Sequence, residues 1–188
     1  MSTIYLDNAA TTKVREEVVS VISSIIKKEY GNPSSTHSYG RSSKSLIESS
    51  RKEIADILNV KSSEIIFTSG GTEGDNMIIR NCVNNLGVSH IITTKIEHHA
   101  VTHTIDDLIR SNNINVSYVK VSKSGHVDLN DLEEILKRSD EKSLVSLMHI
   151  NNEIGNITDI QLVSEICQKY NSLFHSDTVQ SVGHYDLD

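Results

Sequence analysis

The fold class is decided by residues 64–110, which read EIIFTSGGTEGDNMIIRNCVNNLGVSHIITTKIEHHAVTHTIDDLIR. Short apolar runs alternate in this stretch with longer segments of helical period. We expect strands at 65–67 and 90–93 and helices at 72–86 and 100–110. Such alternation is typical of a domain with a mostly parallel sheet, so the sequence predicts an α/β fold.

The same alternation continues toward the C-terminus. Further strands are expected at 116–121, at 144–150 and from 173 onward, and further helices at 131–138 and from 158 to about 170. Asn130, with Glu133 three residues later, is the expected N-cap of the first of these helices, and Thr158, with Gln161, that of the second. Gly87 is expected to end the helix at 72–86. The inward positions of the helix at 100–110 are expected to be Val101, Ile105, Leu108 and Ile109.

Two helices are expected before residue 64, at 15–30 and 42–58. Gly31 is the expected left-handed stop of the first helix. Each helix carries an apolar stripe that we expect to face the core. The stripes are Val18, Val19, Ile22, Ile25 and Ile26 in the first helix and Leu46, Ile47, Ile54, Ile57 and Leu58 in the second.

The composition describes a globular chain with one sizeable core. Of its 188 residues, 37% are hydrophobic and 23% are charged, which excludes disordered and collagen-like chains. The net charge is −7 and no basic tail or arginine-rich helix occurs, so we expect no nucleic acid partner. The N-terminus lacks the basic and apolar regions of a signal peptide, and no run of about 18 apolar residues is present. We therefore expect a cytoplasmic protein without a membrane partner.

Two cysteines, Cys82 and Cys167, lie far apart and outside any C-x-x-C pattern. Both fall on apolar rows of expected helices. This placement favours buried, reduced thiols over a disulfide or a metal site.

A glycine-rich turn, Ser69-Gly70-Gly71-Thr72-Glu73-Gly74, follows the first expected strand. Glycines let the backbone approach an anion, and the helix after the turn offers unpaired N–H groups and the positive end of its dipole. Thr72 adds a hydroxyl. The turn lacks the lysine of a nucleotide P-loop and is too short in glycines for the dinucleotide fingerprint. A tight connection from strand to helix also favours glycine, so this turn alone leaves both interpretations open.

Three histidines, His98, His99 and His103, follow the strand at 90–93. His99 and His103 are four residues apart and share a helical face, so one interpretation is a zinc site. A metalloprotease motif needs glutamate directly after the first histidine, and Ala100 stands there instead. We therefore predict no metal, and interpret His98 as a titratable side chain in a cleft and His99 as an exposed helix start.

Polar loops also follow the strands that begin at 144 and 173, and they contain Asn152 and Asp177. Ligands of open α/β sheets bind outside the carboxyl ends of the strands. Together the loops would place an anion cradle, an imidazole, an amide and a carboxylate along one rim of the sheet. A cofactor with a phosphate, a flat ring and a ring nitrogen would require this set.

Six stretches occur in a fixed order from Ile4 to Asp188, and in them the chain resembles a known family. The stretches are Tyr5–Thr12, Gly31–Ser35 with His37 and Gly40–Arg41, Thr68–Glu73, Glu97–Val101, Asn151–Gly155, and His175–Asp177 with Gln180–Ser181. The chain is similar to the N-terminal half of the cysteine desulfurases, pyridoxal-phosphate enzymes of the class V aminotransferase group. It looks closer to the iron–sulfur-cluster and nitrogen-fixation type of this family.

The resemblance implies a role for each matching residue. Gly71 and Thr72 would bind the cofactor phosphate, and Gly74 stands where the family often has serine. His98 would stack on the pyridine ring and move protons as a catalytic residue, while Asp177 would keep the ring nitrogen protonated. The remaining implied contacts are Asn152 and Gln180 near the phenolic oxygen of the ring, and Asn8 and Ala9 on the substrate side.

The resemblance also implies the architecture: a three-layer α-β-α sandwich with a mostly parallel sheet, incomplete at its C-terminus. Residues 1–14 would belong to the small domain or active-site arm of the family, and residues 15–188 to part of the cofactor-binding large domain. The family's cofactor-binding lysine, in a Ser-x-His-Lys pattern, and its sulfur-accepting cysteine are expected after residue 188. This chain alone is therefore expected to be inactive.

The resemblance implies that the complete protein is a homodimer that converts L-cysteine to L-alanine. It would leave a persulfide on its own cysteine, for a sulfur acceptor or an iron–sulfur scaffold protein. Two alternatives stay open at this point. One is a non-catalytic remnant that acts as a binding or dimerisation module. The other is a related selenocysteine lyase or aminotransferase, because the ring-binding residues are shared.

Overall fold

The computed structural model describes residues 3–112, 114–185 and 187, and it divides into two compact units. The described residues of the N-terminal unit run to Phe67 and include Leu187, and the C-terminal unit is Thr68–Tyr185. A division by compactness does not test the family-based domain boundary after residue 14, which stays a prediction.

The C-terminal unit is built on a four-stranded sheet in the order β2-β1-β3-β4. All three strand pairs are parallel, and Ile91 of β1 lies opposite Val116 of β2 and Leu144 of β3. The strands are β1 His90–Thr93, β2 Asn115–Tyr118, β3 Ser143–Ser146 and β4 Leu173–His175. The predicted α/β fold with a parallel sheet is confirmed.

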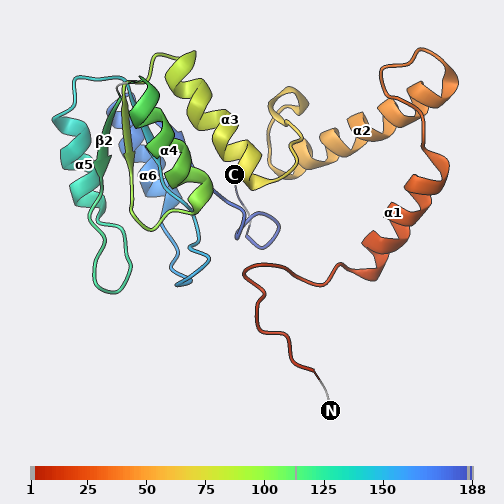
Figure 1. The fold of residues 1–188 in the computed structure, drawn as a ribbon, viewed down its shortest axis with the longest axis horizontal. Helices are drawn as coiled ribbons and strands as arrows, with labels where there is room; N and C mark the ends of the chain where they lie inside the picture. The colour runs from red at the N-terminus through yellow and green to blue at the C-terminus, as the bar shows by residue number, and fades with distance from the viewer. Residues whose placement is uncertain (1–2, 113, 186, 188) are drawn as a thin grey trace. The chain divides into compact units, whose positions relative to one another are not determined.

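Helices cover both faces of this sheet (Figure 1). Neighbouring residues of a strand point to opposite faces, so Ile91 packs with α3 and α4, and Ile92 packs with α5 and α6. The helices are α3 Gly71–Asn84, α4 His99–Asn112, α5 Leu129–Lys137 and α6 Ile160–Lys169. The result is a three-layer sandwich with two separate apolar cores, as the resemblance implies.

The helix ends differ from the predicted ones in a consistent way. Asp128, rather than Asn130, caps α5 and accepts bonds from the N–H groups of residues 130 and 131. Asp159, rather than Thr158, caps α6 and accepts from Leu162 N–H. In both cases a nearby aspartate offers a charged acceptor, which suits the positive end of a helix. Gly87 has φ +72°, so the predicted left-handed stop after α3 is confirmed.

Two predictions for apolar residues, one in each unit, are wrong. Residues 65–67 are not a strand and pair with none of the strands that the structure describes, and Ile66 is 65% exposed. A strand needs hydrogen bonds from a partner, which a short apolar run does not specify by itself. Ile109 of α4 is exposed, although Val101, Ile105 and Leu108 are buried as predicted.

The N-terminal unit contains α1 Glu16–Lys28, α2 Ser38–Ile57 and a short 3₁₀ turn, η1 Ser62–Glu64. Helix α2 begins earlier than predicted because the His37 ring accepts a bond from Gly40 N–H. Gly31 is not in the left-handed region, so its predicted role as a stop is wrong. Glycine is required at this position because the backbone of Tyr39 occupies the space of a Cβ.

The apolar stripes of α1 and α2 are not buried as predicted. Every one of the ten predicted core residues is exposed or only partly buried. Ile26 is 72% exposed and Ile57 is 79% exposed. Tertiary cover decides whether an amphipathic stripe becomes a core, and periodicity does not report it. Within the described residues, no helix is both long and apolar enough to span a bilayer.

Both cysteines are buried, unpaired thiols, as predicted. Cys82 belongs to the core under α3 and α4, and Cys167 to the core under α5 and α6, so the sheet separates them. Burial raises the pKa of both thiols, that of Cys167 to about 12. They are therefore structural side chains in this unit.

The two cores make a stability prediction. Leu132 is fully buried under α5, so Leu132→Ala should lower the free energy of unfolding by about 2–5 kcal/mol. Leu162→Ala in α6, where the leucine is 41% exposed, should cost less than about 1 kcal/mol. Urea unfolding followed by circular dichroism checks both values. Equal losses in the two variants would contradict the assignment of this core.

Candidate functional site

The candidate site lies at the carboxyl edge of the sheet. Strands β1, β3 and β4 are neighbours and parallel, so the loops that follow them leave the sheet at one edge. The loop after β1 carries His98, the loop after β3 carries Asn152, and the loop after β4 carries Asp177. This is the edge where parallel sheets bind ligands.

The N-terminus of α3 meets the loop after β4 at Gly71. A Cβ on residue 71 would lie 2.5 Å from Val179 Cγ2, so any larger residue there would require the Val179 side chain to move. Gly70 is the N-cap residue of α3, and no side chain caps the helix there. The first N–H groups of the helix, including that of the exposed Thr72, therefore remain available to an anion.

The turn before α3 is shaped by its own polar groups. Glu73 Oε2 accepts a bond of 2.5 Å from Ser69 N–H, and Thr68 Oγ1 donates to Gly70 O at 3.1 Å. Hydrogen bonds from Ser69 hold the pKa of Glu73 below its ordinary value. The Glu73 carboxylate thus binds the backbone of residue 69 and stabilises the turn.

Asp177 is a buried carboxylate in the loop after β4, two residues before the Val179 that contacts Gly71. It is 8% exposed, and its Oδ1 accepts a bond of 2.9 Å from Val179 N–H. Val179 also contacts the Gly71 position, so it joins the glycine-rich turn to Asp177, and we refer to Gly71, Val179 and Asp177 together as the wall of the candidate site. Gln180, three residues after Asp177, is half-buried in the same loop.

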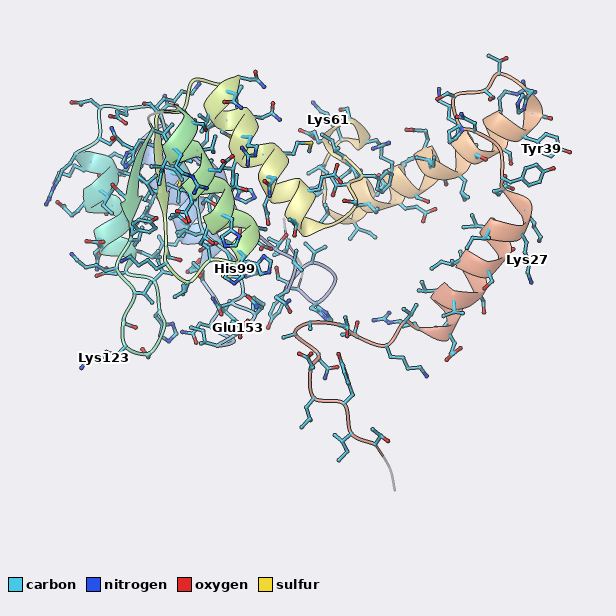
Figure 2. All side chains as sticks on the ribbon, in the orientation of Figure 1. Lys27, Tyr39, Lys61, His99, Lys123 and Glu153 are labelled. Carbon is cyan, nitrogen blue, oxygen red and sulfur yellow. The ribbon has the colours of Figure 1, made fainter. Side chains whose placement is uncertain are left out.

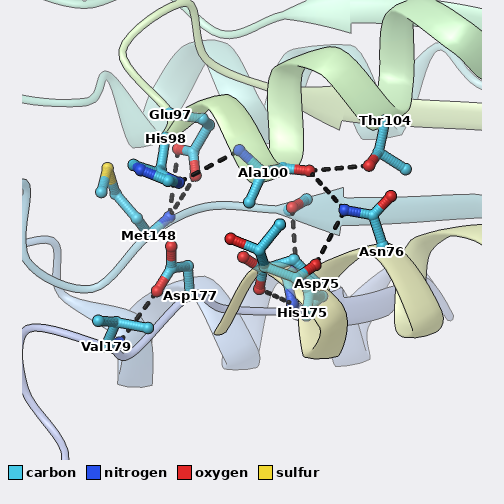
Figure 3. Close-up of polar contacts among 12 residues, drawn as sticks. Asp75, Asn76, Glu97, His98, Ala100, Thr104, Met148, His175, Asp177 and Val179 are labelled. Carbon is cyan, nitrogen blue, oxygen red and sulfur yellow. Dashed lines mark hydrogen bonds and ion pairs between the residues drawn. The ribbon is translucent and has the colours of Figure 1, made fainter. Parts of the chain in front are cut away.

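Glu97 is a second buried carboxylate, on the loop after β1 (Figure 3). Its two oxygens accept from Met148 N–H at 3.2 and 3.0 Å, and Thr94 Oγ1 donates to it at 3.0 Å. Burial raises the pKa of Glu97 to about 7, and the nearby charges of Asp177 and Asp75 act in the same direction. Glu97 therefore joins the loop after β1 to the loop after β3.

His98 lies beside a pocket of about 330 Å³ formed by the loops after β1 and β3. His98 is exposed, and its Nδ1 accepts a bond of 3.2 Å from Ala100 N–H at the start of α4. Asn152 lines the same pocket, as do His99 and Glu153, which Figure 2 labels at this edge. Asn151 supports the pocket wall, since its Nδ2 donates to Ile96 O at 2.7 Å.

The structure places the predicted site residues of this edge in two pairs of neighbours, and their roles at a single ligand stay predictions. The turn at 71–72 and Asp177 share a wall, and His98 and Asn152 share a pocket. Asn8 and Ala9 belong to the N-terminal unit, so their place on the substrate side stays a prediction.

The three histidines that follow β1, His98 in the loop and His99 and His103 in α4, have no metal-site geometry. His103 stacks on His99 with ring centroids 4.9 Å apart. Among the residues that the structure describes, no group of three or more histidines, cysteines or carboxylates is placed to hold a metal ion.

Sequence reasoning missed the buried groups behind this edge. Asp75 is buried in α3 and lies 3.3 Å from the ring of His175 at the end of β4. Asp75 precedes Ile79, Cys82 and Val83 at helical spacing, so a carboxylate falls on the apolar face of α3. A charge at a core position of a helix is the signal that could have identified it.

Comparison with known proteins gives a consistent result. The sequence model of the Aminotransferase class-V family matches residues 4–188. A protein named cysteine desulfurase IscS from Dictyoglomus turgidum is 45% identical over 186 residues, which cover 96% of this chain and 46% of that protein. One with the same name from Methanosarcina thermophila is 42% identical, covering 98% of this chain and 46% of its own length. The chain thus spans about half the length of these relatives.

Solved structures show the same half-length match. A NifS-like protein superimposes with a TM-score of 0.91 at 38% identity, covering 98% of this chain and 51% of that chain. A structure described as SspA in complex with cysteine gives a TM-score of 0.91 at 30% identity, covering 99% of this chain and 53% of its own.

The raised pKa of Glu97 predicts a dependence of stability on pH. Its pKa is about 7 in the folded chain, against 4.5 for an unperturbed glutamate, so the folded state holds an extra proton between these values. The free energy of unfolding should therefore fall as the pH rises through this window. Glu97→Gln should remove on the order of 3 kcal/mol of that fall.

Urea unfolding at about pH 5 and about pH 8 measures the difference. Glu165→Gln is the matched control, because Glu165 is an exposed carboxylate of α6. A pH dependence that is the same in Glu97→Gln as in the unchanged chain would refute the assignment.

Proposed function

Because the chain belongs to the class-V aminotransferase family, we propose that it forms the pyridoxal 5′-phosphate-binding half of a cysteine desulfurase. The complete protein would convert L-cysteine to L-alanine and pass the sulfur to a cysteine of its own as a persulfide. Two relatives named cysteine desulfurase, whose matches cover 96% and 98% of this chain, support the proposal. The observation that carries it is the wall that the glycine-rich turn shares with Asp177.

The residues at this edge fit the cofactor. The uncapped N-terminus of α3 suits a phosphate, and a Cβ at residue 71 would fill the space where the turn meets Val179. Asp177 is a buried carboxylate that suits a protonated ring nitrogen, because buried charges require an opposite partner. The hydroxyl of Ser176, next to Asp177, is buried without a hydrogen-bond partner within the described chain, so this side of the wall retains polar capacity.

When bound, pyridoxal 5′-phosphate supplies an electron-accepting ring to the substrate α-carbon. In the proposal, Gly71 and Thr72 bind the phosphate through the helix N-terminus, and Asp177 holds a proton at the ring nitrogen. His98 stacks on the ring. The bond from Ala100 N–H occupies His98 Nδ1 and leaves Nε2 for proton exchange.

Further contacts of the proposal come from the resemblance. Asn152 and Gln180 would donate hydrogen bonds near the phenolic oxygen of the ring, and Asn8 and Ala9 would line the substrate side. Partners of the complete protein would be a second copy of itself and a sulfur acceptor or iron–sulfur scaffold protein. We also propose a cytoplasmic location for the complete protein.

The test of this function is alanine formation from L-cysteine by the complete gene product. Asp177→Ala should lower the rate at least about a hundredfold, because the ring nitrogen loses its charged partner. Glu165→Gln on the exposed side of α6 should leave the rate unchanged. A protein that binds the cofactor but forms no alanine would support a non-catalytic module instead. Faster release of selenium from selenocysteine would support the related lyase.

Substitution of His98 separates its two proposed roles. His98→Phe keeps an aromatic face without a ring nitrogen, so cofactor retention after dialysis should persist while alanine formation falls by about 100-fold to 10,000-fold. His98→Ala should lose both the retention and the rate. If His98→Phe forms alanine at the unchanged rate, His98 moves no proton in the reaction.

A further inference from the structure

A buried pair joins the two elements that carry the ends of the proposed cofactor site. His175 Nε2 of β4 lies 3.3 Å from Asp75 Oδ1 of α3. The two side chains are only 6% and 8% exposed, respectively. Figure 3 shows the pair together with Asp177 and Val179.

The ring of His175 is held from its other side as well. His175 Nδ1 lies 3.0 Å from Ser146 Oγ, and Ser146 is the neighbour of His175 in the register of β3 with β4. The imidazole is therefore fixed between the sheet and α3. A shift of α3 along the sheet would break one of its two contacts.

The positions of the pair in the chain relate it to the ligand-binding groups. Asp75 follows Thr72 by three residues of α3, which is about one helical turn or 5 Å along the axis. His175 precedes Asp177 by two residues, about 7 Å along an extended chain. One short contact thus relates the helix N-terminus to the ring-nitrogen carboxylate.

Burial of this pair costs free energy, because both side chains lose their contact with water. Asp75 Oδ2 is buried and has no hydrogen-bond partner within the described chain. Replacing a buried charged pair by apolar side chains is often neutral or stabilising, whereas removing one partner is costly. Stability alone therefore gives little reason for such a pair, and orientation gives a better one.

We propose that Asp75 and His175 are positioning residues that set the separation between the phosphate-binding N-terminus of α3 and the ring-nitrogen carboxylate of Asp177. This inference rests on the proposed function, since it concerns the same cofactor. A rigid ligand that contacts both ends gains from a preset separation, because no binding energy is spent on moving α3 against β4. A ligand that contacts only one end gains nothing from it.

The test compares a whole ligand with its two halves on this chain. Pyridoxine 5′-phosphate has the ring and the phosphate but no aldehyde, so it cannot react with surface lysines. Pyridoxine lacks the phosphate, and inorganic phosphate lacks the ring. Calorimetry measures the whole ligand, and amide chemical shifts of Gly71 and Thr72 follow inorganic phosphate, with those of Val179 and Gln180 following pyridoxine.

Asp75→Ala should lower the affinity for pyridoxine 5′-phosphate at least about tenfold. It should change the affinity for pyridoxine and for inorganic phosphate less than about twofold. Asp75→Asn keeps an oxygen that accepts from the ring of His175, so it should restore affinity to within about threefold. Asp107→Asn is the matched control. It removes a carboxylate of α4 that lies 2.8 Å from Arg80 of α3, away from this edge, and should change no affinity.

A second variant covers the case in which Asp75→Ala does not fold. His175→Asn keeps a polar group for Ser146 but is too short to reach Asp75, and it should show the same loss for the whole ligand alone. Circular dichroism establishes that each variant is folded.

The outcomes separate the inference from the function on which it rests. Unchanged affinity for pyridoxine 5′-phosphate in the folded variants would overturn the positioning role and leave the function standing. Equal losses for the whole ligand and both halves would also overturn it, because they indicate general damage to the site. If the unchanged chain binds none of the three ligands, the proposed function fails and the inference fails with it.

Discussion

Close packing between α3 and the loop after β4 is the constraint on which the candidate site depends. The N-terminus of the helix lies against the side chain of Val179, and the absence of a Cβ at residue 71 allows this close contact. This approach puts the free N–H groups of the helix and the carboxylate of Asp177 against one wall. The loops after β1 and β3 then add His98 and Asn152, since the strand order makes them neighbours along the same edge. A bulkier residue at position 71 would require Val179 to move and would so disturb the contact between α3 and the loop that carries Asp177.

Three acidic side chains are buried near this edge, and they indicate which kind of ligand the site would favour. Asp75, Glu97 and Asp177 are all buried, and the first and last raise the pKa of Glu97 through their charge. Several buried carboxylates in one region favour protons or a cationic partner. Under the proposed function, the protonated ring nitrogen of the cofactor is such a partner. The local electrostatics and the resemblance therefore point to the same kind of ligand.

Much of the fold of the C-terminal unit could be predicted from the sequence, because the patterns that determine its strands and helix ends are local. The strand at 90–93 is a short apolar run before a polar loop, and Gly87 is a stop that one residue determines. The failures are non-local. Residues 65–67 have strand composition without a pairing partner, and nothing in the pattern reports that absence among the described strands. The position of His98, Asn152 and Asp177 after strand ends could be predicted from the expected topology. The pairing of Asp75 with His175 required knowing which side of α3 meets β4.

The separation of the two cores by the sheet gives each layer its own chemical reporter. Cys82 is enclosed on one side and Cys167 on the other, and neither thiol reacts readily while it stays buried with a raised pKa. The rate at which a thiol reagent labels each sulfur therefore records how often that particular layer opens. Cys82 reports the layer that contains α3 and α4, and Cys167 reports the layer that contains α5 and α6. Local opening of the two helical layers can thus be followed separately in the native sequence, without introducing a probe.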